Sequence, residues 1–282
     1  MGKLIAFGWY GGKFSHLDWL LPLLPEATHF CEPFGGSAAT LLNRKPSPVE
    51  TYNDIDGELV NFFSVLRNQK DDLIEAIGLT PFSREEFENA ISEPTQGLSD
   101  LERARRFYIR ARQVRTGLAQ KASTGRWAHC RLTSRAGMAG AISRWLGAVE
   151  GLPLIAQRLI RVQIENDSAI NVIRRYDSAD TLFYCDPPYP HESRRDTNAY
   201  GYEMSDDDHR ELAELLRSVK GKVALSGYRC NLMDELYSDW RCIEASPRTA
   251  HSVKTIRQEA LWVNYELEDL ESECPNPQKS LM

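Results

Sequence analysis

Short apolar runs recur along the chain and alternate with stretches of helical periodicity. Five runs are flanked by breakers or loop residues, as strands are. They are Ala27–Glu32, Val49–Asp54, Thr181–Cys185, Lys222–Ser226 and Ala260–Glu266. Strands that alternate with helices predict an α/β domain with a mostly parallel sheet.

Helix signals lie between these strands. Residues Gly57–Asn68 carry apolar side chains at helical spacing. Three other positions have the composition of a helix start. They are Ser83 with Glu86, Ser99 with Glu102, and Ser205 followed by three aspartates. The last of these helices is expected to end before Gly221, a plausible residue after a helix C-terminus.

Residues 74–158 interrupt the alternation, because they read as helices plus a basic loop that contains Gly and Ser. We therefore expect a catalytic domain made of residues 1–73 and 159–271, with 74–158 as a helical insertion. Residues 272–282 are polar with two prolines and are expected to be a disordered tail.

Composition is that of a globular protein: 42% of the 282 residues are hydrophobic and 26% are charged. No apolar run approaches the ~20 residues of a membrane helix, and the N-terminus lacks the layout of a secretion signal. These features favour the cytoplasm. The six cysteines lack Cys-x-x-Cys spacing, so we expect reduced thiols and no zinc site.

Charge is segregated, although the net charge is only −6. Between residues 103 and 149 there are eleven Arg or Lys and no Asp or Glu, whereas the rest of the chain has 23 basic and 40 acidic residues. A basic segment on an acidic protein is typical of polyanion binding. A solvated helix face is the alternative, but such faces usually mix both signs.

A glycine turn follows the first predicted strand and leads into a helix. It reads Glu32-Pro33-Phe34-Gly35-Gly36-Ser37. Glycines let the backbone approach a ligand closely, and ligands of open α/β sheets bind beyond the carboxyl ends of strands. Asp54 ends the next strand, where an acid can accept hydrogen bonds from a ribose. The pair suits a nucleoside cofactor, and the absence of Gly-x-Gly-x-x-Gly disfavours NAD.

The second chemical motif, Asp186-Pro187-Pro188-Tyr189, follows the strand Thr181–Cys185. Two prolines stiffen the loop and remove two N–H donors, so the loop presents acceptors. The Asp186 carboxylate and the Pro187 carbonyl can hold both hydrogens of an exocyclic amine and aim its lone pair at an electrophilic methyl group. Tyr189 adds an aromatic face for stacking on a base drawn out of the duplex.

Taken in order, these motifs resemble those of the Dam-type DNA adenine-N6 methyltransferases (D12 class, alpha group). The N-terminal Trp9-Tyr10-Gly11-Gly12-Lys13 resembles the family's Trp-x-Gly-Gly-Lys motif. The resemblance implies an α/β fold: a Rossmann-like S-adenosylmethionine-dependent methyltransferase sheet with an inserted helical DNA-recognition domain. It also implies S-adenosyl-L-methionine as cofactor and double-stranded DNA as partner, with no membrane or metal requirement, in a monomer or weak dimer.

The resemblance assigns roles to matching positions. Catalytic roles fall on Asp186, Pro187 and Tyr189. Cofactor-binding roles fall on Trp9, Lys13, Glu32, Pro33, Phe34, Gly35, Ser37, Asp54, Asp167, Ser168 and Asp186. The family's recognition loop departs here: Gln113-Val114-Arg115-Thr116-Gly117-Leu118 keeps Arg-Thr-Gly but lacks the flanking Asn and aromatic residues. The recognition sequence therefore stays open.

The basic loop supplies the expected DNA contacts. They are Arg115, Lys121, Arg126, Trp127, Arg131 and Arg135. Arginine suits guanine edges and lysine suits phosphates, and Trp127 is the candidate to stack on or wedge into DNA. Three alternatives remain: cytosine-N4 methylation, RNA adenine methylation, and a non-catalytic DNA-binding protein with a methyltransferase fold. The missing Pro-Cys motif disfavours C5-cytosine methylation.

Overall fold

The computed structural model describes residues 2–92, 94–119, 125–193, 201–246 and 258–267. Its centre is a seven-stranded sheet in the order β5-β2-β1-β6-β7-β9-β8. The strands are β1 (His29–Glu32), β2 (Val49–Asn53), β5 (Val162–Glu165), β6 (Thr181–Cys185), β7 (Lys222–Tyr228), β8 (Arg241–Glu244) and β9 (Glu259–Val263). The first five in the sheet order are parallel, and β9 runs antiparallel to β7 and β8.

All five strands that the sequence predicts are present, with ends shifted by up to three residues. The two that it misses, β5 and β8, lie at the two edges of the sheet. Their side chains are only partly buried, so they lack the continuous apolar run that marks β6. Edge position explains why the apolar pattern does not reveal them.

Helices cover both faces of the sheet. Along β6, Leu182 and Tyr184 pack into one apolar core, while Phe183 and Cys185 pack into the other. The first core is covered by α2 (Ala39–Asn43) and α3 (Gly57–Asn68); the second by α8 (Ala169–Tyr176), α9 (Asp206–Ser218) and α10 (Asn231–Leu236). Short turns η1 (Lys13–His16), α1 (Leu17–Leu20) and η2 (Leu21–Leu23) precede β1. This three-layer arrangement is the expected α/β fold.

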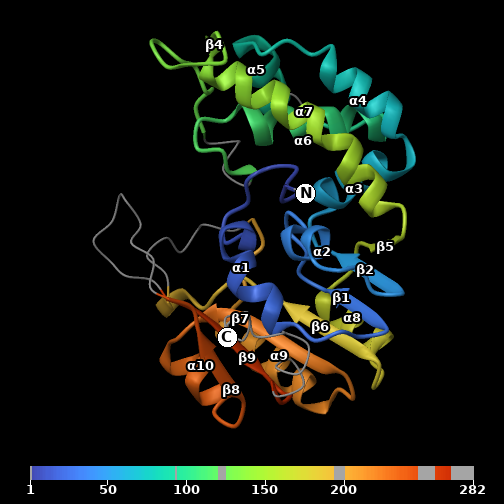
Figure 1. The fold of residues 1–282 in the computed structure, drawn as a ribbon, viewed down its shortest axis with the longest axis vertical. Helices are drawn as coiled ribbons and strands as arrows, with labels where there is room; N and C mark the ends of the chain where they lie inside the picture. Colours follow the sequence, from blue (N-terminus) through green and yellow to red (C-terminus); the bar gives the residue numbers. More distant parts are fainter. Residues whose placement is uncertain (1, 93, 120–124, 194–200, 247–257, 268–282) are drawn as a thin grey trace, which may run out of the picture.

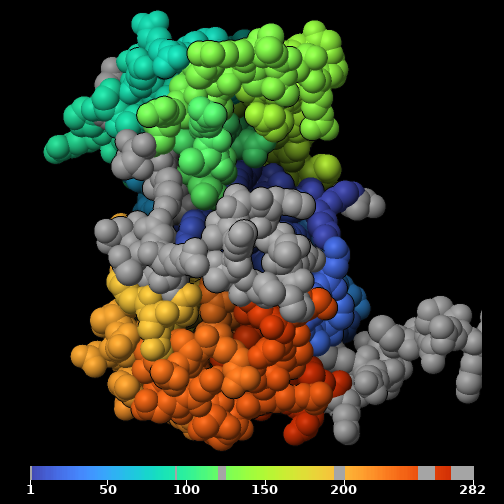
Figure 2. Space-filling model, turned by 90° about the vertical axis from the view of Figure 1, so that its left-hand side faces the viewer, coloured from blue at the N-terminus to red at the C-terminus, as the bar shows by residue number. Residues whose placement is uncertain are grey.

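Four helices gather at one end of the molecule, beyond the sheet (Figure 1). They are α4 (Lys70–Gly78), α5 (Arg84–Ser92), α6 (Asp100–Gln113) and α7 (Gly140–Leu159), with a small hairpin of β3 (Ser134–Arg135) and β4 (Met138–Ala139) before α7. Figure 2 shows the helices of this end, in green, and the later strands and helices, in yellow to red, at opposite ends of the molecule.

The helical end shares its core with the sheet. Phe62 of α3 stacks on Tyr108 of α6 with ring centroids 5.5 Å apart, and Phe7 packs edge-on against Phe62 and Phe107. Helix α4 spans the boundary expected at residue 74. The helices of residues 74–158 therefore pack directly against α3, and the domain boundary at residue 74 stays a prediction.

Helix starts follow the predicted signals. Ser205 forms a reciprocal capping box with Asp208 at the start of α9. Ser83 and Ser99 accept from the backbone N–H three residues on, but the expected Glu86 and Glu102 carboxylates bind Arg105. At its other end α9 stops at Ser218.

Gly221 serves close packing rather than a helix cap, which corrects the expectation from sequence. A Cβ there would lie 2.7 Å from the Thr181 carbonyl oxygen, so only glycine lets β7 start beside β6. In the part of the chain that the structure describes, no helix is long and apolar enough to span a bilayer. The same residues contain no cluster of three or more His, Cys, Asp or Glu suited to a metal.

Candidate active site

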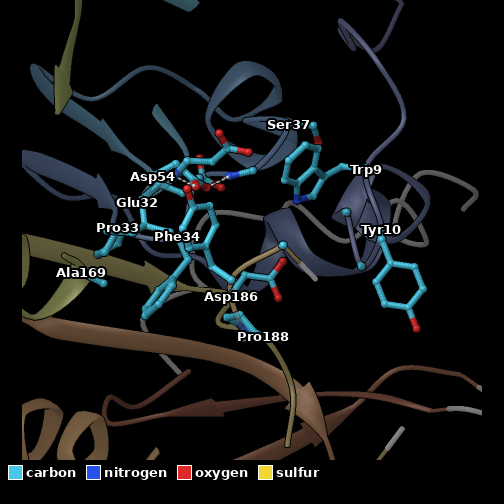
Figure 3. A pocket seen from close by; sticks show the side chains of 18 of the residues that line it. Trp9, Tyr10, Glu32, Pro33, Phe34, Ser37, Asp54, Ala169, Asp186 and Pro188 are labelled. Carbon is cyan, nitrogen blue, oxygen red and sulfur yellow. Dashed lines mark hydrogen bonds between the residues drawn. The ribbon is translucent and has the colours of Figure 1, made fainter. Parts of the chain in front are cut away.

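The carboxyl ends of the parallel strands meet at one large cavity. The strand order reverses between β1 and β6, because β2 and β5 lie on one side of β1 while β6 lies on the other. Open α/β sheets bind ligands at such a switch point. The loops after β1, β2, β5 and β6 all contribute to a cavity of about 700 Å³ (Figure 3).

The turn after β1 is built by close backbone approaches. A Cβ at Gly35 would lie 2.1 Å from the Tyr52 ring, and one at Gly36, whose φ is +48°, would lie 2.8 Å from Trp9 Nε1. The Gly35 N–H donates to the Asn53 carbonyl at 2.7 Å. Glycine is required at both positions, and the result is a backbone concavity that faces the Trp9 indole.

Asp54 fixes this turn from the neighbouring strand. Its carboxylate accepts from the Gly36 N–H at 2.8 Å and from the Asp56 N–H at 2.9 Å. Burial raises the pKa of Asp54 to about 6, although both backbone donors lower it. Carboxylate oxygens have further lone pairs, so the group retains acceptor capacity toward the cavity that it lines.

Asn53 ties two of the loops together, a role that the sequence analysis misses. Its amide nitrogen donates to the Pro33 carbonyl at 2.8 Å and to the Asp167 carbonyl at 3.0 Å, and its amide oxygen accepts from the Asp167 N–H. Its only sequence signal is an amide at the end of a buried strand.

Asp167 itself turns its carboxylate toward the protein. The carboxylate accepts from the Ser168 N–H, from Asn171 and from Arg175, and these bonds lower its pKa. Ser168 lines the cavity, whereas Asp167 does not contribute to the described lining.

Asp186 sits at the end of β6 and is held by Lys13. The Lys13 ammonium donates to the two Asp186 carboxylate oxygens at 2.6 and 2.8 Å, and to the Gly11 carbonyl at 2.8 Å. Burial acts to lower the pKa of Lys13, but the Asp186 and Glu259 carboxylates outweigh it and raise the pKa. The amine therefore stays charged and fixes the carboxylate by ionic hydrogen bonds.

A second carboxylate lies behind Asp186. Glu259, the first residue of β9, is 4% exposed, and its Oε1 lies 3.4 Å from Lys13 Nζ. The Tyr189 hydroxyl is hydrogen-bonded to Glu259 and lies 3.2 Å from Asp186 Oδ1. The Tyr228 ring packs edge-on against Tyr189 at 4.8 Å.

The structure collects ten of the eleven predicted cofactor positions around the cavity. They are Trp9, Lys13, Glu32, Pro33, Phe34, Gly35, Ser37, Asp54, Ser168 and Asp186. Figure 3 shows Trp9 and Ser37 on one side and Asp54, Glu32 and Phe34 on the other, with Asp186 between them. Burial raises the pKa of Glu32 well above its usual range, and Asp186 adds to the shift.

The tetrapeptide of residues 186–189 is only partly exposed to the cavity. Asp186 and Pro188 line it, while Pro187 and Tyr189 are buried behind them. Tyr189 is 2% exposed. Little of its ring is exposed to a base in this conformation, so the stacking of Tyr189 on a base stays a prediction.

The helical end supplies one wall of the cavity, which the sequence does not reveal. Ile91 of α5, Phe107 and Arg110 of α6, and Ala119 all line it. The Ala119 N–H donates to the Gly8 carbonyl at 3.1 Å, next to Trp9. The cavity therefore lies between the sheet and the helices.

Three predicted DNA contacts come together at a second, smaller cavity of about 430 Å³. Arg115, Arg126 and Trp127 line it. The Arg115 N–H donates to the Arg126 carbonyl at 2.7 Å, and this bond closes the loop. Trp127 packs against Phe82 at 5.3 Å and its indole N–H donates to Gln113, so it is half-buried in the helical end.

The other three predicted DNA contacts fall into two groups. Arg131 and Arg135 are exposed, and Arg135 belongs to the β3–β4 hairpin, whose turn uses positive φ at Ala136 and Gly137. Lys121 lies outside the described residues.

The α6 part of the basic run is used inside the molecule, which corrects the interpretation of the whole run as one polyanion-binding face. Arg103 pairs with Glu58 at 2.7 Å, and Arg105 and Arg106 each pair with Glu102. Glu58 of α3 and Glu102 of the same helix therefore neutralise these arginines.

The cavity suits S-adenosylmethionine on structural grounds. It has a glycine-lined concavity, an indole beside it and a buried acid at the end of β2, in a volume of about 700 Å³. Acidic side chains outnumber basic ones in its lining, and carboxylates such as Asp54 and Asp56 can complement the positive charge of a sulfonium.

Comparisons with known proteins agree with this geometry. The family model "D12 class N6 adenine-specific DNA methyltransferase" matches residues 9–258. A "DNA N-6-adenine-methyltransferase" of Escherichia phage P1 is 26% identical over 246 residues, which cover 83% of this chain and 31% of that protein. The chain thus spans about a third of that relative's length.

Two further relatives carry similar names. The "Type II methyltransferase M1.LlaDCHI" of Lactococcus lactis subsp. cremoris is 25% identical over 82% of this chain and 84% of its own length. A "DNA adenine methylase" of Vibrio cholerae serotype O1 is 38% identical over 24% of this chain and 25% of its own length. Because the family model covers most of the residues, this chain belongs to the D12 class of N6 adenine-specific DNA methyltransferases.

Proposed function

We propose that this protein transfers a methyl group from S-adenosylmethionine to N6 of adenine in a specific sequence of double-stranded DNA. The observation that carries the proposal is the position of Asp186. Its carboxylate lies at the switch point of the sheet, beside the glycine turn and at the wall of the cavity. An amino group at that carboxylate would lie next to the methionine end of the cofactor.

Asp186 would act as an oriented acceptor. The lone pair of an adenine amino group is delocalised into the ring, so the nitrogen is a poor nucleophile. When the amino group donates a hydrogen bond to the Asp186 carboxylate, electron density on the nitrogen increases and its lone pair is aimed at the methyl group. Lys13 binds both carboxylate oxygens and Tyr189 also binds Oδ1, which leaves a lone pair on Oδ2, so the carboxylate is fixed and still able to accept.

The residues around the turn would hold the cofactor. When bound, S-adenosylmethionine supplies an electrophilic methyl group on a sulfonium. We assign the methionine end to the Glu32–Ser37 turn with Trp9, and the ribose to Asp54. Ser168 would meet the adenine end, with Asp167 shaping the backbone there through its bonds to Asn171 and Arg175.

The helical end would supply recognition. Arg115 and Arg126 lie at one cavity and Arg131 and Arg135 are exposed. Within the described residues, these guanidinium groups have no ion pair of the kind seen in α6. Such groups suit phosphates and guanine edges. The target adenine must leave the duplex to reach Asp186, and Tyr189 is the aromatic residue nearest to that position.

The direct test is methylation of DNA in a host that lacks endogenous methylation. DNA from cells expressing the chain is digested and its modified nucleosides are separated, with Asp186→Ala as control. N6-methyladenine with the parent chain and none with the variant is expected. N4-methylcytosine alone would replace the proposal by cytosine methylation, and no modified base would favour a non-catalytic DNA-binding protein. Competition between duplex DNA and duplex RNA separates the RNA alternative.

A further inference from the structure

Four ionisable side chains meet behind the cavity. They are Lys13, Asp186, Tyr189 and Glu259, and they come from η1, from the loop after β6 and from β9. We propose that Glu259 takes part in the reaction: through the Tyr189 hydroxyl, it accepts the proton that the target amino group gives to Asp186. This inference rests on the proposed function, which supplies the amino group.

Charge balance alone does not explain Glu259. Asp186 already neutralises the Lys13 ammonium through two short hydrogen bonds. Glu259 adds a second carboxylate to the same site, 3.4 Å from Lys13 and 4% exposed. Among the described residues, Glu259 pairs only with Lys13, which Asp186 already neutralises. A second buried carboxylate on one ammonium is costly, and this cost is explained if the charge serves the reaction.

The reaction creates a proton that must go somewhere. Methyl transfer forms an N–C bond at the amino nitrogen and breaks a C–S bond, whose electron pair stays on sulfur. The nitrogen then carries a positive charge and must lose one of its two protons. Asp186 is the base within reach. Burial raises its pKa, as does the Glu259 carboxylate, against the opposing effect of Lys13.

The Tyr189 hydroxyl links the two carboxylates. It lies 3.2 Å from Asp186 Oδ1 and is hydrogen-bonded to Glu259. A phenol has one proton, so it donates fully to only one of them. Once Asp186 is protonated, it donates to the Tyr189 oxygen while Tyr189 passes its own proton to Glu259. Asp186 becomes ionised again, Tyr189 stays neutral and Glu259 becomes a carboxylic acid.

After the methylated product leaves, the proton can return from Glu259 to Asp186 along the same path. The Asp186 side chain is 17% exposed, so it can return the proton to water. Glu259 contacts Lys13 and Tyr189, and Tyr189 in turn contacts Asp186. Tyr184 of β6 also faces the cluster. Tyr228 of β7 packs against the Tyr189 ring and holds it in place.

The experiment compares four chains: the parent, Glu259→Gln, Tyr189→Phe and the double variant. Glutamine keeps the size and an acceptor oxygen for Tyr189 but cannot accept the proton. Single-turnover methyl transfer is measured at saturating cofactor and DNA from pH 5.5 to 9. We expect each single variant to slow transfer about 10- to 100-fold, within the range of acid–base contributions, with cofactor affinity nearly unchanged.

The double variant and the pH profile separate a proton path from a structural role. Residues on one path lose the same function, so the double variant is expected to match the slower single variant. Without the Glu259 charge, the pKa of Asp186 falls, and the acid limb of the profile should move to lower pH. Glu244→Gln on the exposed side of β8 is the matched control, with the parent rate expected.

A parent-like rate and profile for Glu259→Gln would overturn the inference, as would additive losses that track a fall in melting temperature. Infrared difference spectra between the ligand-free parent and Glu259→Gln give a readout without turnover. We expect the variant to lose a carboxylate band at pH 7; loss of a protonated carboxyl band instead would also overturn the inference. A parent chain that methylates no DNA would defeat the proposed function, and the infrared result would still decide the ionisation of Glu259.

Discussion

The catalytic cleft and the helical end use charged side chains differently. In the cleft, a few groups are buried and converge on Asp186, each with a partner from a different element. In the helical end, arginines are numerous and divide into two sets. Arg103, Arg105 and Arg106 of α6 pair with acids such as Glu58 and Glu102, whereas Arg131 and Arg135 are exposed.

This difference predicts that substitutions in the two regions will change different measured quantities. Changes in the cleft should alter the rate of methyl transfer and leave DNA affinity intact. Changes at exposed arginines should alter DNA affinity and its salt dependence. Changes at the ion-paired arginines of α6, which are Arg103, Arg105 and Arg106, should alter stability alone. A substitution that moves the wrong readout would contradict the division.

The largest effect is expected in the cleft. Asp186→Asn removes the ionised acceptor, and we expect the single-turnover rate to fall about 10²- to 10⁴-fold. Lys13 keeps Glu259 as a partner, so the variant should fold. Binding to duplex DNA, measured by fluorescence anisotropy, should match the parent. A large loss of DNA affinity would mean that Asp186 supports recognition as well.

The double variant Arg131→Ala/Arg135→Ala tests the exposed set. Each guanidinium that contacts a phosphate contributes about 0.9 to the slope of log K against log salt. We expect the slope to shrink by about 2 and the Kd for duplex DNA to rise on the order of tenfold at moderate salt. The transfer rate at saturating DNA should stay within about twofold. An unchanged slope would remove these residues from the DNA interface.

Gly8→Ala tests the contact between the two regions. A Cβ at Gly8 would lie 2.1 Å from the Gly117 carbonyl oxygen, so the loop that carries Arg115 must shift. Both the transfer rate and DNA affinity should fall, each by up to about tenfold if the strain costs about 1.4 kcal/mol. Gly147→Ala in α7 is the control, because nothing lies within 4 Å of its added Cβ. An unaffected Gly8→Ala would show that the regions work independently.

Asp54 predicts a pH effect on cofactor binding. Its pKa is raised to about 6 in the folded protein, so it is protonated below that pH and accepts ribose hydroxyls less well. Calorimetry should show cofactor affinity falling as pH drops from 7 to 5. Because the pKa of Asp54 is higher in the folded protein than its usual value, protonation of Asp54 stabilises the ligand-free fold. This contribution is complete below about pH 3.8. It is lost as pH rises through 6. Asp54→Asn should flatten both dependences.

The smallest effect is expected at α6. Arg105 binds Glu86 at 3.0 Å and Glu102 at 2.7 Å with partial exposure. Arg105→Gln should lower the free energy of unfolding by about 1 kcal/mol, seen as a lower denaturant midpoint. Its salt slope for DNA should equal that of the parent; a smaller slope would place Arg105 at the DNA and break the contrast with the hairpin.

The central strands and the order of the two motifs can be predicted from the sequence, and ten of the eleven positions predicted to bind a cofactor line the cavity. Strand β6 is buried at all five positions, and Leu182 to Cys185 form a continuous apolar run, so its pattern needs no tertiary information. Gly35 and Gly36 stand in the turn because bulkier residues would collide with Tyr52 and Trp9. Such local requirements leave a mark on the sequence.

Tertiary structure alone decided the partners of the charged groups. The acids that neutralise α6 include Glu58, 45 positions from Arg103, and Glu259 reaches Tyr189 across 70 positions. The edge strands β5 and β8 are only partly buried, so they leave no clear apolar signal. Local steric and burial requirements act within a few residues, whereas pairing of charges depends on which elements the fold brings together.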